Sequence, residues 1–127
     1  MTVFTGSIMT IVAGDDLDVT RTVIDVPATQ TLSKAWLTFK TNIDALDPGL
    51  LQKVITPSPV AGQGQITDTA ADGTGTLIFQ LTAADTLALP VGVSVPYDVK
   101  VKTSADKIYT AEQGIYLAIA RVTQTTT

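Results

Sequence analysis

Two alternating runs of apolar and polar residues, joined by a short connector, constrain this chain more than any other feature. The apolar positions of the two runs are Leu77, Phe79 and Leu81, then Tyr97, Val99 and Val101. A period of two is the pattern of a pleated strand with one buried face. The segment 77–101 therefore predicts two strands whose apolar sides face a common core.

The connector between these runs carries its own start and stop signals. Thr82 is followed three residues later by Asp85, the spacing of a capping box with Asp in place of the usual Glu. Pro90 lacks an amide hydrogen and restricts the residue before it, so a helix cannot continue past it. We therefore expect one short helical turn near residues 83–89. Two leucines of the connector are expected to close the end of the core: Leu87 and Leu89.

Further strand signals are spread along the chain and are separated by turn-forming residues. We expect strands at residues 8–12, 17–24, 35–40, 50–55, 65–68, 108–110 and 115–122. Trp36, Leu37 and Phe39 are expected to anchor the core. Arg21 interrupts the apolar side of its strand, which indicates a strand end or an interface. Short strands at this spacing predict one all-β domain, a sandwich or barrel of about seven to nine strands.

The charge and hydropathy of the chain limit its partners. A net charge of -4 and an isoelectric point near 4.4 leave no basic field for nucleic acid phosphates or anionic lipid. We therefore expect no nucleic acid and no membrane as partner, and the N-terminal sequence predicts no targeting segment. Charged residues make up only 16% of the chain, against about 25% in ordinary soluble proteins. This low fraction favours a surface that is partly covered by other subunits.

The chain lacks the residues on which most catalysis depends. It has no Cys and no His, and Glu112 is its only glutamate. These absences remove thiolate nucleophiles, the Ser-His pairing and most zinc and iron sites. Asp15, Asp16 and Asp18 could supply oxygens to calcium, but they lack the glycine and distal glutamate of the helical-loop pattern and are better explained as turn acids. We expect a protein that is not an enzyme and has no cofactor and no metal site.

A series of segments in fixed order supplies a resemblance to a known family. The segments are GDDL at 14–17, WLTFK at 36–40, DGTG at 72–75, LTAADTLALPVG at 81–92, YDV at 97–99 and a closing strand that contains Gly114. Over residues 14–122 this order resembles the N-terminal domain of phage baseplate upper proteins and related stand-alone phage domains. The resemblance implies an immunoglobulin-like antiparallel β-sandwich at 14–123. An N-terminal arm or first strand would precede it at 1–13, and a polar tail would follow at 124–127.

The same resemblance implies a non-enzymatic structural protein of the bacteriophage virion, made in the host cytoplasm. Its partners would be other phage structural proteins and copies of itself. Two placements stay open, namely a capsid decoration or cement protein and a tail or baseplate adaptor. The family resemblance favours the tail or baseplate, whereas the small size and low charge of the chain favour the capsid. We expect the two placements almost equally.

Assembly contacts are expected at the ends of the chain, at a Pro/Gly-rich loop and at exposed sheet edges. The residues expected to make them are Val3, Phe4, Ile8, Arg21, Pro57 and Pro59. The N-terminal arm has two readings, because it could be the first strand of the sandwich or could extend a neighbouring subunit's sheet.

A glycan-binding adhesion module of the particle is the alternative function. It would use Trp36 and the tyrosines Tyr97, Tyr109 and Tyr116 as a sugar platform, although core or interface packing is the simpler explanation of these aromatic residues. Asp98, Lys100 and Lys102 are expected on one solvent-exposed strand face as ordinary cross-strand partners.

Overall fold

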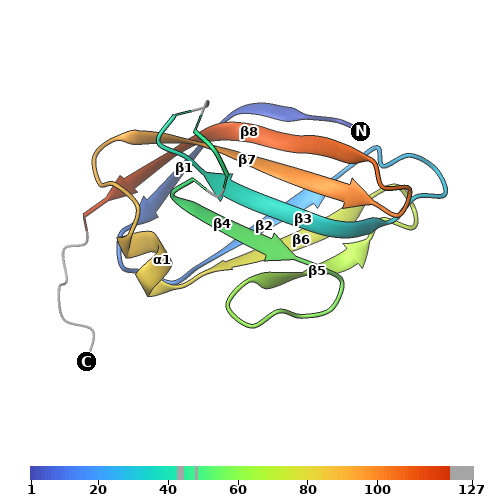
Figure 1. Cartoon of the computed structure of the whole chain (residues 1–127), viewed down its shortest axis with the longest axis horizontal. Helices are drawn as coiled ribbons and strands as arrows, with labels where there is room; N and C mark the ends of the chain where they lie inside the picture. Colours follow the sequence, from blue (N-terminus) through green and yellow to red (C-terminus); the bar gives the residue numbers. More distant parts are fainter. Residues whose placement is uncertain (43–44, 48, 121–127) are drawn as a thin grey trace.

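A computed structural model describes residues 1–42, 45–47 and 49–120 of the chain. Within these residues the backbone forms two β-sheets packed face to face, with one short helix at an end of the sandwich (Figure 1). In chain order the elements are β1 (Phe4–Val12), β2 (Leu17–Val23), β3 (Leu32–Phe39), β4 (Leu51–Ile55), β5 (Gly64–Thr69), β6 (Gly75–Leu81), α1 (Ala83–Leu87), β7 (Ser94–Thr103) and β8 (Ile108–Ile119). The predicted all-β sandwich is confirmed.

The strands divide unequally between the two sheets. The larger sheet has the order β1-β8-β7-β3-β4, and the smaller sheet has the order β2-β6-β5. Neighbouring strands are antiparallel except for β1, which runs parallel to β8 with Ile8 opposite Ile115. β1 lies outside residues 14–123, the range expected to form the antiparallel sandwich, and its parallel direction was not predicted. Because β1 and β8 are the first and last strands, no hairpin joins them and fixes their relative direction.

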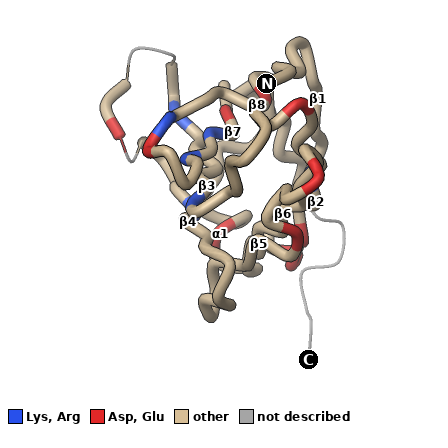
Figure 2. The backbone as a smooth tube through the Cα atoms, turned by 90° about the vertical axis from the view of Figure 1, so that its right-hand side faces the viewer, with Lys and Arg blue, Asp and Glu red and all other residues tan. Residues whose placement is uncertain are grey.

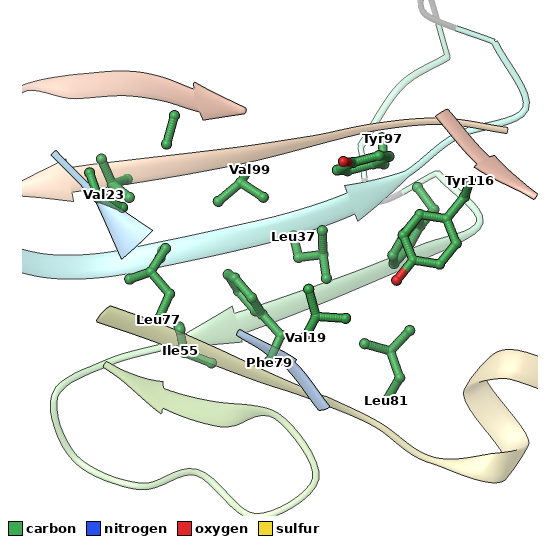
Figure 3. Close-up of a cluster of buried hydrophobic side chains, with 14 of the residues drawn as sticks. Val19, Val23, Leu37, Ile55, Leu77, Phe79, Leu81, Tyr97, Val99 and Tyr116 are labelled. Carbon is green, nitrogen blue, oxygen red and sulfur yellow. The ribbon is translucent and has the colours of Figure 1, made fainter. Parts of the chain in front are cut away.

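The core lies between the sheets and follows from the alternation of each strand. Leu77, Phe79 and Leu81 of β6 point toward Leu37 of β3 and Val99 of β7 (Figure 3). All five side chains are buried. The prediction of a common core for the two alternating runs is confirmed.

Trp36 does not belong to this core. Its neighbours Leu37 and Phe39 are fully buried, but Trp36 is only half-buried. It shares the opposite face of the sheet with Lys100 of β7, its paired residue. The prediction that Trp36 anchors the core is wrong, because the period of two that buries Leu37 and Phe39 turns Trp36 to the outer face.

The capped connector forms as predicted, with one difference. The Thr82 hydroxyl accepts from the Asp85 amide at 3.2 Å, and the Asp85 carboxylate accepts from the Thr82 amide at 2.8 Å. Leu89 is buried, whereas Leu87 is 60% exposed, so its predicted role in closing the core is wrong. The helical turn instead directs Thr86 inward, where its hydroxyl donates to the Asp15 carbonyl at 2.7 Å.

Two strand boundaries also differ from prediction. The segments expected at 108–110 and 115–122 are one strand, since β8 stays paired with β7 through a bulge that follows Thr110. Glu112, Gln113 and Gly114 are weak strand formers, which is why the sequence suggests a gap there. β3 begins at Leu32, three residues before the predicted start of the strand at 35–40. The predicted residues beyond 120, including the tail 124–127, lie outside the described residues.

Candidate functional site

The outer face of the five-stranded sheet, which points away from the core, divides into two chemically different halves. Residues paired across neighbouring strands lie on the same face of a sheet. The strand register therefore shows which residues form each cross-strand row of this surface. The rows on β7, β3 and β4 are mainly polar and surround Trp36. The rows on β1 and β8 are mainly apolar. Most of the basic positions of the chain gather on the β3, β4 and β7 side (Figure 2).

The polar half is built around Trp36. Lys100 of β7 and Val54 of β4 flank it in one cross-strand row. The Lys34 ammonium lies 5.3 Å from the centre of the Trp36 ring, within the range of a cation–π contact. The next row places Thr38 between Asp98 and Gln52. One aromatic ring therefore lies among groups that donate and accept hydrogen bonds.

These side chains line a hollow of about 360 Å³, which we call the Trp36 hollow. Its lining residues are Trp36, Thr38, Lys40, Asp47, Gln52, Asp98, Lys100 and Ile108. The Gln52 amide donates to the Thr38 hydroxyl at 3.0 Å, and Lys40 forms an ion pair with Asp47 at 2.9 Å. Burial raises the pKa of Asp98, although Lys100 and Lys40 oppose the shift. Six of the eight lining residues are polar or charged, and Trp36 and Ile108 are the two apolar ones.

The apolar half is a continuous band across β1 and β8. The residues of this apolar band are Ile8, Val12, Ile115, Leu117 and Ile119. Ile8 pairs with Ile115 and Val12 pairs with Ile119, while exposed Thr10 pairs with Leu117 between them, so the band is continuous along β8 and has one polar position on β1. Ile8 is 69% exposed, and Ile115 and Ile119 are about 40% exposed, at 38% and 41%. Contiguous apolar side chains on an outer face are typical of a surface that packs against another molecule.

A buried polar cluster lies beneath the band, between the two sheets. Arg21 of β2 forms an ion pair with Glu112 of β8, with Nε 2.9 Å from the carboxylate. The Tyr97 hydroxyl donates to the same carboxylate, and burial together with this hydrogen bond raises the pKa of Tyr97 to about 12. Gly114 allows this packing, because a Cβ there would lie 2.8 Å from the Tyr97 ring and would collide with the Ser7 carbonyl oxygen. The cluster joins β2 to β8 and supports the β1–β8 edge.

The residues expected to make assembly contacts fall into separate places. Phe4 and Ile8 lie on β1 and Val3 precedes it, all with exposed side chains. Residues 4–12 pair with β8 of their own chain. Within one chain, the N-terminal arm is therefore the first strand of the sandwich.

The other expected contacts lie elsewhere. Pro57 and Pro59 are exposed in the loop after β4, at the opposite edge of the sheet from β1 (Figure 1). Arg21 lies within β2 and not at a strand end, and its charge pairs with Glu112 inside the domain. The structure therefore groups Val3, Phe4 and Ile8 but not the other three residues.

Sequence reasoning missed the β8 contribution to the apolar band. The run from Ile115 to Ile119 is apolar at successive positions, and not only at alternate ones. A strand that is apolar on both faces is typical of one covered on both sides. This signal was available in the sequence and identifies the residues that face outward.

The described residues also show whether the arrangements expected for a metal site or for a membrane-spanning helix are present among them. Asp16 accepts a hydrogen bond from the Ala83 amide at 2.7 Å, which agrees with a turn role for this acid. Among residues 1–42, 45–47 and 49–120, no group of three or more His, Cys, Asp or Glu is arranged to hold a metal ion. No helix in that part of the chain has the length and apolarity needed to cross a bilayer.

Comparison with known proteins gives no family assignment. No protein-family model matches the sequence, and no curated protein matches it.

Proposed function

We propose that this protein is a non-enzymatic structural component of a bacteriophage particle that assembles through the apolar band. The observation that carries the proposal is the exposure of Ile8, Ile115 and Ile119 on a sheet face that residues 1–42, 45–47 and 49–120 leave uncovered. Exposing such side chains to water is unfavourable, and covering them with another subunit removes that cost. The partners would be other particle proteins and copies of this chain.

The strand order supports the phage resemblance. If β2 to β8 are taken as strands B, C, C′, D, E, F and G, the two sheets read BED and GFCC′. This is the arrangement of immunoglobulin-like sandwiches. The chain differs from antibody domains in having no cysteine pair and in directing its strand C tryptophan outward. The resemblance rests on the order of the sequence segments, including the connector, and does not need those antibody features.

The β1 edge offers a second means of assembly. In the part of the chain that the structure describes, β1 is paired on one side only, so its other side is available to a strand of a neighbouring subunit. Phe4 and Val3, at the start of this edge, are each close to half exposed. A partner could therefore add a strand at β1 while its side chains cover the apolar band.

Particle incorporation tests the proposal directly. In phage that encode the chain, Ile8→Asp with Ile115→Asp should sharply reduce the copies per purified particle, because the charges would be buried on docking. Thr110→Asp is the matched control, since it adds a charge to the same strand in the polar half. Quantitative mass spectrometry provides the readout. Incorporation of the double variant at the wild-type level would contradict the proposal.

The copy number of the wild-type protein separates the two placements. Hundreds of copies per particle would indicate capsid decoration or cementing, whereas a few tens or fewer would indicate a tail or baseplate adaptor. Imaging of the intact particle would give the same distinction by position. Absence of the protein from purified particles would overturn both placements.

A further inference from the structure

We propose that the Trp36 hollow binds a neutral hexopyranose unit of a surface glycan. The hollow is in the polar half of the outer face, away from the apolar band, so the proposal goes beyond particle assembly. Its volume of about 360 Å³ lies at the small end of ligand sites, which are commonly about 300–1,000 Å³. A single sugar ring or the end of a chain is therefore the appropriate size of ligand.

The aromatic platform is held rigidly. Trp36 lies within β3, which is paired on both sides, with β7 and β4. The indole is directed outward by the strand alternation and is flanked by Val54 and Lys100. A half-buried ring of this kind presents an apolar surface against which the C–H face of a sugar can pack.

The polar groups around the ring match sugar hydroxyls, each of which both donates and accepts. The Gln52 amide nitrogen donates to Thr38, so the Thr38 hydroxyl hydrogen and the Gln52 carbonyl oxygen point elsewhere. Asp98 supplies an acceptor, and Lys40 supplies donors. Thr38 is only 4% exposed, so part of this hydrogen-bonding surface is firmly fixed.

The charges favour a neutral ligand over an anion. Lys40 is paired with Asp47, and Lys100 lies close to Asp98. Positive and negative groups thus alternate around the hollow and do not form a single basic field. A carboxylate or phosphate would gain from the lysines but would be repelled by the two aspartates.

The only tryptophan of the chain provides a site-specific signal. The full chain would be titrated with methyl glycosides of glucose, galactose, mannose and N-acetylglucosamine, and separately with glucuronate, while Trp36 fluorescence is followed. We expect at least one neutral glycoside to give a saturable change. Failure of every neutral glycoside at millimolar concentration, or a response to glucuronate alone, would overturn the proposal.

Variants locate the binding. Gln52→Ala and Asp98→Asn should each weaken the fluorescence-detected affinity by about tenfold, the effect of losing one good polar contact. Calorimetry should show a loss of about tenfold or more for Trp36→Ala and a much smaller loss for Trp36→Phe, which keeps an aromatic face.

Two control variants separate this site from the rest of the molecule. Thr20→Ala, on the other sheet, should bind the sugar normally. Ile115→Ser, in the apolar band, should also retain sugar binding while assembly is impaired. Undiminished binding by Gln52→Ala and Asp98→Asn would place the sugar elsewhere and overturn the proposal.

Discussion

The two halves of the outer face belong to the same five-stranded sheet, but one is apolar and the other is polar. The β1–β8 half presents the exposed side chains of Ile8, Ile115 and Ile119, a surface suited to contact with another protein. The half centred on β3 and β7 presents Trp36 and Lys100 above a polar hollow, a surface suited to a hydrated ligand. If both proposals hold, a single sheet carries an assembly surface and a recognition surface side by side.

The two halves also differ in what supports them from inside. Beneath the apolar band lies the ion pair of Arg21 and Glu112, which links the two sheets. Beneath Trp36 the neighbouring inward residues are Leu37 and Ala35, which are purely apolar and fully buried. The polar half also has one interior ion pair, between buried Lys53 of β4 and Asp85, but its Asp98 carboxylate lies on the outer face. Removal of the interior Glu112 carboxylate should therefore cost much more stability than removal of the exterior Asp98 carboxylate.

The largest expected effect comes from removing the interior carboxylate. Glu112→Ala should lower the free energy of unfolding by about 3 kcal/mol, because it leaves Arg21 partly buried without its ion-pair partner and removes the acceptor of Tyr97. Asp98→Ala, on the polar half, should change it by about 0.5 kcal/mol or less. Urea unfolding followed by circular dichroism would measure both values. If the two variants lost similar amounts of unfolding free energy, the two halves would not differ in how their carboxylates contribute to stability.

A smaller effect is expected where the two strands of the apolar band meet. Gly114→Ala should cost about 2 kcal/mol, since the added methyl group collides with the Ser7 carbonyl and the Tyr97 ring. The displacement of β1 should also reduce particle incorporation without changing sugar binding at Trp36. Gln113→Ala is the neighbouring control, because Gln113 is exposed on the same strand. If Gly114→Ala left the free energy of unfolding unchanged but altered sugar binding at Trp36, the two halves would not be independent.

Local patterns predicted much of the fold. Period-two alternation located the core faces of β6 and β7, and the spacing of Thr82 and Asp85 located the start of α1. These features depend on residues that are close in sequence. The parallel pairing of β1 with β8 was not predictable in the same way, because it depends on which distant strands meet in the folded chain.

The candidate sites were harder to predict for the same reason. Trp36 was assigned to the core because large aromatic residues are usually buried, yet its place in the alternation already directs it outward. Gln52 and Asp98 come from separate strands, and only the sheet register places them beside Thr38. Ile8 was identified as a contact residue, but its partner Ile115 required the parallel pairing. When a surface is formed by residues from three or four strands, the sequence of any one strand does not show which residues will be neighbours.

The smallest expected effect concerns acid, and it has opposite signs at two aspartates. Burial raises the pKa of Asp98 above its usual 3.8, so the stability that its protonation gives is present at low pH and is lost as the pH rises through the folded value. At Asp85 burial has the opposing effect, but hydrogen bonds from Lys53 and Thr82 prevail and lower the pKa. The stability that ionised Asp85 gives is therefore present above pH 3.8 and is lost as the pH falls through its lower folded value.

Urea unfolding between about pH 3 and about pH 6 would give the free energy of unfolding as a function of pH. The slope of this curve would separate the two contributions, each of about 1 kcal/mol or less. Asp98→Asn should remove a decline in stability above pH 3.8, and Asp85→Asn should remove a rise that ends near that pH. The slope is the readout, because Asp85→Asn also weakens the ion pair with buried Lys53 at all pH values. If Asp98→Asn left the slope unchanged, the carboxylate would be as well hydrated as in the unfolded chain. The hollow would then be an open surface in water, and the proposed sugar site would lose one of its fixed acceptors.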